Sequence, residues 1–141
     1  MHWWKRFTNM VGMTDYVTDH FRMSEFDCRD GTPYNPLWVE EHLLRLCLNL
    51  EVIRECFSDN KITIVSGYRT KSHNKAVGGA KDSQHLLGEA ADFEIEGFGA
   101  RGAAKEVKAL MKGGLITPGG IGSYPGWTHL DIRGKYVAWR K

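Results

Sequence analysis

Two stretches of the chain repeat their apolar residues at helical spacing. After Asn35-Pro36, an N-cap side chain followed by proline at the first helical position, apolar residues recur at steps of three and four until Asp59-Asn60. The second stretch covers residues 100–112 and ends at Gly113-Gly114. Each helix is predicted to bury one face, formed in the first by Val39, Leu43, Leu46, Leu50, Ile53 and Phe57 and in the second by Ala103, Val107, Leu110 and Met111.

Strand patterns lie between and after these helices. Residues 61–66 are rich in β-branched side chains, and residues 90–96 alternate apolar with acidic ones. A short helix is predicted at 71–77, before Gly78-Gly79. Short strands joined by glycine and proline turns are predicted at 120–124, 128–133 and 136–139. The sum is a single-domain α+β fold, with an antiparallel sheet and helices packed on one side.

Composition changes this picture little. With 141 residues, 42% of them hydrophobic and 26% charged, the chain has the size and make-up of one globular domain. Its formal net charge of +2, with both signs interspersed, gives no reason to predict nucleic-acid binding. We expect no membrane span, because no apolar run approaches ~18 residues. The N-terminus shows no signal peptide, so we expect synthesis in the cytoplasm and release by other means if the protein acts outside it.

The N-terminal segment, residues 1–20, differs from the rest of the chain. It is rich in aromatic residues without clear periodicity, namely Trp3, Trp4, Phe7 and Tyr16. Such a segment could dock on the core or on a partner. We therefore divide the chain into this segment and a domain of residues 21–141.

Two histidines and a carboxylate form a candidate metal site. His85 precedes the strand that carries Asp92, and Gly88 between them permits a tight turn. Asp92 points away from the apolar side chains of its strand. His129 and Asp131 are two residues apart on a strand, so they share a face, and either could be the ligand beside a polar helper. Two imidazoles and one carboxylate suit zinc and leave a fourth position for water, as in catalytic zinc sites.

Three motifs in order extend this site over most of the chain. They are Ser66-Gly67-Tyr68-Arg69, the Ser-x-His-x-x-Gly-x-Ala-x-Asp run from Ser83 to Asp92, and Gly119-Gly120-Ile121-Gly122 followed by Thr128-His129-Leu130-Asp131. From about Phe21 to Trp139 the chain resembles the zinc D-Ala-D-Ala peptidases, particularly their short single-domain bacterial and phage branch. The resemblance implies the α+β fold shared with hedgehog signalling domains. It also implies that Zn²⁺ is held by His85, Asp92 and His129.

The activity implied by the resemblance is hydrolysis of D-alanine-containing peptides in peptidoglycan, by carboxypeptidase or endopeptidase action. Tyr68 and Arg69 match the segment that supplies a substrate-facing arginine, which could hold a carboxylate or a developing oxyanion. The alternative for Arg69 is a structural ion pair. Ser83 could orient a ligand or the substrate, or cap its turn.

The chain departs from the resemblance at Gly126. Several branches of that family place a glutamate or aspartate three residues before the last zinc histidine, as the general base. We therefore take Asp131 as the candidate catalytic base, because it shares a face with His129. The alternative for Asp131 is a carboxylate that orients His129 or another ligand.

Two further interpretations of the chain stay open beside the peptidase. One is a non-catalytic zinc domain, for which the missing acid at Gly126 is the best sequence argument. The other is a structural part of a phage particle, with virion proteins bound through the aromatic N-terminal segment. An endolysin-like enzyme released to act on the cell wall fits the missing signal peptide equally well.

Overall fold

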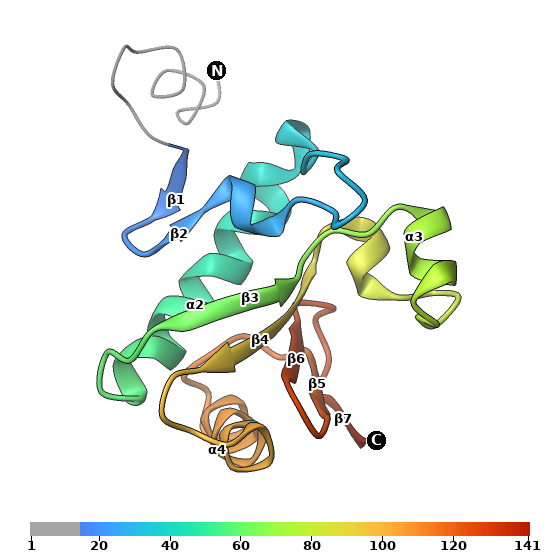
Figure 1. The fold of residues 1–141 in the computed structure, drawn as a ribbon. Coiled ribbons are helices and arrows are strands. Elements are labelled where there is room, and N and C mark those ends of the chain that lie inside the picture. Colours follow the sequence, from blue (N-terminus) through green and yellow to red (C-terminus); the bar gives the residue numbers. More distant parts are fainter. Residues whose placement is uncertain (1–14) are drawn as a thin grey trace.

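A single five-stranded sheet organises the chain (Figure 1). The structure is a computed structural model, and it describes residues 15–141. The sheet has the order β3-β4-β6-β5-β7. Its strands are β3 (Ile62–Ser66), β4 (Ala90–Ile95), β5 (Gly120–Ser123), β6 (Thr128–Asp131) and β7 (Val137–Arg140). The predicted α+β class is confirmed.

One edge of the sheet differs from the predicted antiparallel arrangement. The β3–β4, β4–β6 and β5–β6 pairs are antiparallel, but β7 runs parallel to β5. The chain crosses over after β6 and places β7 beyond β5 instead of beside β6. Because β5 and β6 are antiparallel, a strand that reverses direction after β6 and pairs with β5 has to be parallel to it.

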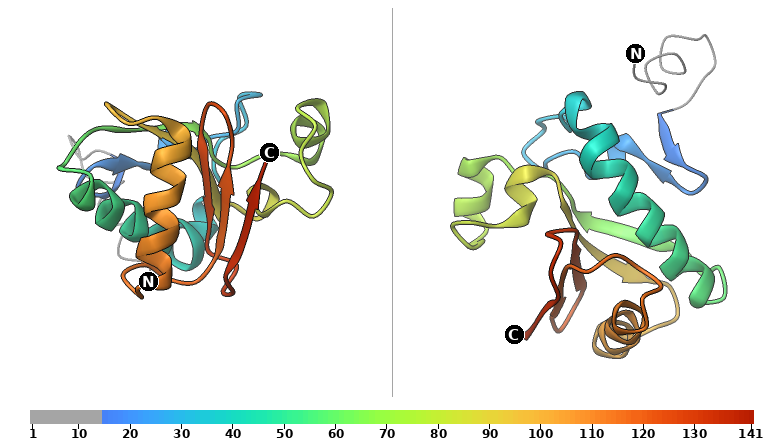
Figure 2. Two further views of the ribbon diagram at one scale, coloured as in Figure 1. Left: turned by 90° about the horizontal axis from the view of Figure 1, so that it is seen from below. Right: turned by 180° about the vertical axis from the view of Figure 1, so that it is seen from behind.

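The two predicted long helices cover one face of this sheet (Figure 2). α4 (Ala100–Lys112) has the predicted bounds. The other helical segment starts at Pro36, where the Asn35 side chain accepts a hydrogen bond from the backbone N–H of Leu37. It continues as the 3₁₀ turn η2 (Pro36–Trp38), the π-helical turn η3 (Val39–Leu43) and the regular helix α2 (Leu44–Cys56). The start of this helical segment and its buried face were predicted from the sequence, but the π-helical turn η3 was not.

The strands divide their side chains between this helical core and the opposite face. On β4, Phe93 and its neighbours Ala91 and Ile95 join the core. On β6, Leu130 does so. Because side chains alternate along a strand, the residues between these point to the face that α2 and α4 leave free.

Two small elements flank the end of the sheet where β3 ends and β4 begins. α3 (Lys71–Ala76) is capped by Thr70, whose hydroxyl accepts a hydrogen bond from the N–H of His73. The 3₁₀ helix η4 (Gln84–Leu87) leads into β4 and ends at Gly88, whose φ of 68° favours glycine. The turn predicted at Gly88 is therefore present.

The part of the N-terminal segment that the structure describes packs on the domain. β1 (Tyr16–Thr18) and β2 (Phe21–Arg22) form a short antiparallel pair, with Val17 and Phe21 in the core. A 3₁₀ turn, η1 (Met23–Phe26), follows. Trp3, Trp4 and Phe7 lie outside the described residues, and the division at residue 20 stays a prediction. Within residues 15–141, no helix has the length and apolar character needed to cross a bilayer.

Candidate metal centre

Asp92 and His129 face each other across the centre of the sheet. They are register partners on the antiparallel strands β4 and β6, although 37 residues separate them in the chain. Directly opposed residues have Cβ atoms about 5 Å apart, so the pairing alone brings their side chains together. His85 joins them from η4, immediately before β4. One donor atom from each of the three residues lies within 4.8 Å of the others, and all three residues are buried.

His85 presents a single free nitrogen to this cluster. Its Nδ1 donates a hydrogen bond of 2.6 Å to the carbonyl of Gly67, so the proton resides there. Its Nε2 lies 3.2 Å from Asp92 Oδ1 in a geometry that makes no hydrogen bond, and it is buried without a partner. Burial lowers the pKa of His85 and favours the neutral imidazole, which is the form that binds metals. An orphaned, oriented imidazole nitrogen is what a metal ligand requires.

His129 is held by a carboxylate on each side of its ring. Nδ1 lies 3.0 Å from Asp92 Oδ1, and Nε2 lies 2.8 Å from Asp131 Oδ2. Burial acts to lower the pKa of His129, but the hydrogen bonds with Asp131 and Asp92 outweigh it and raise this pKa. Nδ1 is therefore the nitrogen that shares the cluster with His85, and Asp131 occupies the other end of the ring.

Asp92 uses its two oxygens differently. Oδ1 faces both histidines, and Oδ2 accepts a hydrogen bond of 2.9 Å from Arg69 Nη2. Burial acts to raise the pKa of Asp92, but the hydrogen bond from His129 and the proximity of His85 outweigh it and lower this pKa below its ordinary value. The carboxylate is thus ionised, with one oxygen held in place and the other directed at the two ligand nitrogens.

Arg69 makes the contacts expected for its ion-pair alternative. Besides Asp92, its guanidinium donates to Ser66 Oγ at 3.0 Å and to Asn74 Oδ1 at 3.2 Å. The β-bulge between Ile64 and Ser66 shifts the register at the end of β3, where the chain turns toward Arg69. Arg69 therefore links β3, α3 and the metal cluster.

Asp131 is fully buried and accepts hydrogen bonds at both oxygens. Oδ1 receives the N–H of Gly120 at 2.8 Å and Arg133 Nε at 2.9 Å, while Oδ2 receives Arg133 Nη2 at 2.7 Å and faces His129 Nε2. Burial acts to raise the pKa of Asp131, but hydrogen bonds from His129 and Arg133 outweigh it and lower this pKa. These contacts favour the alternative role, in which Asp131 orients His129, over that of a base facing solvent.

The glycine next to Asp131 is required by close approach. A Cβ built on Gly120 would lie 2.3 Å from Asp131 Oδ2, where no real side chain fits. Of the Gly119-Gly120 pair in the sequence motif, Gly120 therefore makes room for the Asp131 carboxylate, and Gly119 makes room for the backbone carbonyl of Asp131. Gly126 differs: a Cβ there would meet no atom within 4 Å.

A cavity of about 890 Å³ lies beside the metal cluster, between α3 and η4. Its lining includes Tyr68, Arg69 and Ser83, the three residues predicted to contact substrate, but none of the three candidate ligands. Arg69 and Ser83 nevertheless connect it to the cluster. Ser83 caps η4, since its Oγ accepts a hydrogen bond of 3.2 Å from the N–H of His85. Capping of the turn was one of the roles that the sequence analysis gave for Ser83, beside orienting a ligand or the substrate.

The donor set fits a zinc-type ion. Two imidazole nitrogens and one carboxylate oxygen converge, each supported from behind by Gly67, Asp131 or Arg69. The three are the set that the sequence motif singled out. A family model described as Peptidase M15 matches residues 19–131. The chain belongs to the peptidase M15 family.

One curated relative adds to this M15 assignment. The zinc D-Ala-D-Ala carboxypeptidase of Streptomyces albus G is 36% identical over 86 residues, which make up 60% of this chain and 32% of that protein. The chain therefore spans about a third of the length of the relative. All candidate ligands lie inside the M15 match, whereas β7 lies beyond it.

Three residues of this M15 site were not assigned their contacts from the sequence. Gly67 contributes a backbone carbonyl, which no side chain reveals. Trp139 on β7 packs its ring 5.0 Å from that of His129 and donates to the hydroxyl of Tyr124. Arg133 donates hydrogen bonds to Asp131. Its position two residues after Asp131 puts both side chains on the same side of an extended chain, so this contact could have been predicted.

Proposed function

We propose that this M15 chain is a zinc-dependent peptidase that hydrolyses D-alanine-containing peptide bonds of peptidoglycan. One observation carries the proposal: His85 Nε2, Asp92 Oδ1 and His129 Nδ1 converge, with the remaining polar atom of each side chain already bonded to the protein. Such a set of three ligands is typical of catalytic zinc sites. The M15 family and the carboxypeptidase relative support the choice of metal and substrate.

In this proposal, the chain fixes the ligands before any substrate arrives. Zinc bound there would lower the pKa of a water molecule and polarise the scissile carbonyl. The carbonyl of Gly67 keeps the proton of His85 on Nδ1, so Nε2 stays a free donor. Arg69 holds Asp92 Oδ2, which leaves Oδ1 for the metal. Asp131 accepts the Nε2 proton of His129 and so fixes the orientation of that ring.

The substrate peptide is proposed to enter through the cavity between α3 and η4. Tyr68, Arg69 and Ser83 line it, together with three lysines and a single acidic residue, Asp82. A peptide with free carboxylates suits this lining. The guanidinium of Arg69 lies in this lining and also donates a hydrogen bond to Asp92. To bind a substrate carboxylate, it would have to replace one of its present hydrogen bonds with a bond to the substrate.

Hydrolysis of purified peptidoglycan tests the proposal, with and without a chelator, alongside metal analysis of the same preparation. We expect about one zinc per chain and release of D-alanine or cleaved cross-links that stops on chelation and returns with zinc. Released D-alanine would identify a carboxypeptidase, and opened cross-links an endopeptidase. Full activity of metal-stripped protein would overturn the proposal.

Gly126 favours a second candidate function, a non-catalytic zinc domain that serves binding or structure. The position that carries an acid in several related branches has no side chain here, and Asp131 is fully occupied. In this case the same preparation would hold one zinc and release no product from any wall. The space around Gly126 permits a direct test: Gly126→Glu, which meets no neighbour at Cβ, should then create turnover.

The biological setting we propose is endolysin-like or phage-associated degradation of cell walls. It rests on the resemblance to the short single-domain branch and on the tryptophan-rich start of the chain. Co-purification with phage particles would indicate virion partners. A protein found free in lysates, and absent from washed particles, would indicate an endolysin-like enzyme.

A further inference from the structure

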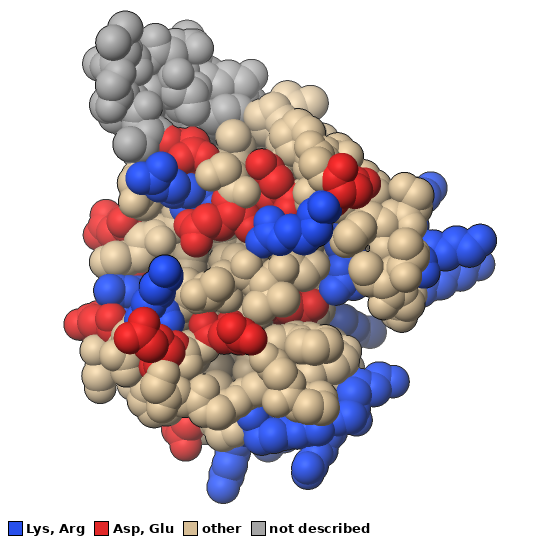
Figure 3. All heavy atoms as spheres, viewed as in Figure 1, with Lys and Arg blue, Asp and Glu red and all other residues tan. Residues whose placement is uncertain are grey.

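A stripe of positive charge runs along α4, which lies between Asp92 and His129 in the sequence. Arg101, Lys105, Lys108 and Lys112 are spaced by four, three and four residues, which places them on one face of the helix. In Figure 3 the Lys and Arg side chains gather along the lower rim of the molecule, where Figure 1 places α4 and the C-terminal strands. This concentration is unexpected in a chain with a net charge of only +2.

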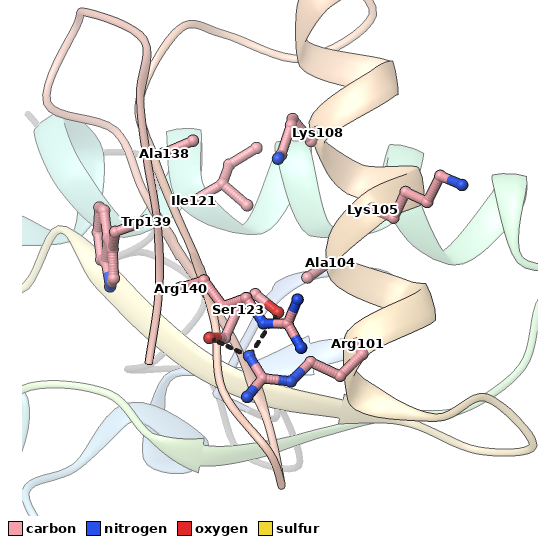
Figure 4. A pocket seen from close by; sticks show the side chains of 9 residues that line it. All are labelled: Arg101, Ala104, Lys105, Lys108, Ile121, Ser123, Ala138, Trp139 and Arg140. Atoms are coloured by element: carbon pink, nitrogen blue, oxygen red, sulfur yellow. Dashed lines mark hydrogen bonds between the residues drawn. The ribbon is translucent and has the colours of Figure 1, made fainter.

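Arg101, Lys105 and Lys108 of this stripe form one wall of a cavity of about 450 Å³, which we call the basic groove (Figure 4). Its other wall comes from β5 and β7. Four of its lining residues are cationic, and none is acidic: Arg101, Lys105, Lys108 and Arg140. In Figure 4, Arg101 and Lys108 point from α4 toward the strands, and Arg140 points from β7 toward Arg101.

Three of the four cations of the basic groove have no carboxylate partner within residues 15–141. Among the described residues, Lys105, Lys108 and Arg140 form no ion pair. Arg101 donates hydrogen bonds to the carbonyl and hydroxyl of Ser123 and to the main-chain oxygen of Lys141, and these bonds fix its guanidinium at the groove. Like charges gathered in a concave site raise its positive potential, and a bound anion would relieve their repulsion.

We propose that the basic groove binds a linear polymer of phosphodiester units carried by the cell wall. A phosphate group offers the oxygens that guanidinium forks and ammonium groups recognise best. Successive cations on one helical face lie about 5–6 Å apart, so they follow a chain with a charge on every unit better than they follow a single ion. The assignment of the polymer to the cell wall rests on the proposed function. The inference that the basic groove binds a polyanion is independent of it.

The lining of the basic groove favours such a polymer over nucleic acid. Proteins that bind single strands without sequence preference stack bases on aromatic side chains. Trp139 is the aromatic residue of this lining, and it is already packed on His129 and bonded to Tyr124. Along β7, Trp139 and Arg140 point to opposite sides, so a polymer in the groove leaves the metal centre open.

Binding of purified poly(glycerol phosphate) to the zinc-loaded chain, measured by calorimetry at low and moderate salt, tests this proposal. The variant Lys108→Glu/Arg140→Glu reverses one charge on each wall and spares Arg101, which bonds Ser123. The control Arg45→Glu/Lys61→Glu makes the same change in net charge at exposed positions of α2 and of the opposite sheet edge, next to β3. We expect the groove variant to lose roughly tenfold or more in affinity, and the control less than about threefold.

Two results would overturn the proposal. One is equal loss of affinity in both variants, which would mean a response to net charge alone. The other is tighter binding of single-stranded DNA of equal charge than of the phosphate polymer. Hydrolysis of a short soluble peptide, read in parallel, separates this test from the proposed function: polymer binding can persist when no peptide is cleaved, and peptide cleavage can persist in the groove variant.

Discussion

The metal centre lies on β4 and β6 and the basic groove on β5 and β7 of the same sheet, and their charged groups are paired in opposite ways. In the metal centre, Asp92 is paired with Arg69 and Asp131 with Arg133, and every one of these contacts is buried or half-buried. In the basic groove, Lys108 and Arg140 face an open cavity without a carboxylate. Buried charges require partners from the chain itself, whereas charges at a surface can be left for a partner from outside.

This contrast explains why the two regions should respond differently to change. The metal centre is fixed by hydrogen bonds behind each ligand, so losing one supporting group leaves a buried atom unsatisfied. The groove is held by the fold of α4 and β7, and its cations contribute little to that fold. Substitutions in the first region should alter metal binding and stability together, while those in the second should alter binding alone.

The largest effect is expected from His85→Ala. It removes a ligand whose Nε2 has no other partner, so zinc binding should weaken by more than about 100-fold, beyond the loss typical for a supporting residue. Hydrolysis of peptidoglycan should fall below detection. Metal analysis after dialysis against a weak chelator measures the first effect, and product release measures the second.

His20→Ala is the matched control for this variant. His20 is an exposed histidine that is bonded to Glu51, away from the sheet face that holds the ligands. It should keep one zinc per chain, and a chelator should lower its melting temperature as it does for the unchanged protein. If His85→Ala retained zinc while His20→Ala lost it, the assignment of ligands would be wrong.

A smaller loss is expected from Asp131→Asn, and it separates the two roles of this residue. If Asp131 orients His129, the amide disrupts the contact with Nε2 and the pair with Arg133, and zinc affinity falls by roughly 10–100-fold. If Asp131 is the general base, zinc affinity stays unchanged and kcat falls. Zinc titration and kcat at saturating zinc distinguish these outcomes. Complete loss of zinc, as for His85→Ala, would make Asp131 itself a ligand.

Much of this architecture could be predicted because local patterns determine it. The apolar spacing gave the bounds of α4, and alternation along residues 90–96 gave β4 with Asp92 on the free face. The parallel β7 could not be predicted, since it depends on where the chain crosses after β6. The π-helical turn before α2 likewise leaves no mark on the spacing of buried residues.

The candidate site likewise has a part that could be predicted from the sequence and a part that could not. Its three candidate ligands could be predicted because their spacing forms a recognisable motif, and the structure brings them together. The supporting contacts could not be, because Gly67 acts through its backbone and Trp139 reaches His129 only once β7 is placed beyond β5. The basic stripe of α4 is visible in the sequence. What it faces is a property of the assembled sheet.

A moderate effect is expected from Tyr34→Phe, which acts on the turn behind His85. The buried Tyr34 hydroxyl donates a hydrogen bond of 2.6 Å to the carbonyl of Gly88, the residue that ends η4. Phenylalanine keeps the ring but leaves that buried carbonyl unsatisfied, at a cost of about 1–3 kcal/mol in unfolding free energy. Tyr16→Phe, at an exposed ring, is the control. Equal stability of both variants in urea would show that the turn does not depend on Tyr34.

The smallest effect on stability is expected from Lys108→Glu/Arg140→Glu, and this completes the contrast. Neither side chain forms an ion pair with an Asp or Glu among the described residues, so the free energy of unfolding should change by less than about 0.5 kcal/mol. Any change should be a gain that shrinks with added salt, because the new carboxylates would relieve the repulsion around Arg101. Urea denaturation at two salt concentrations measures it. A loss of more than about 1 kcal/mol would mean that these cations hold α4 against β7, and that the groove is part of the fold's own support.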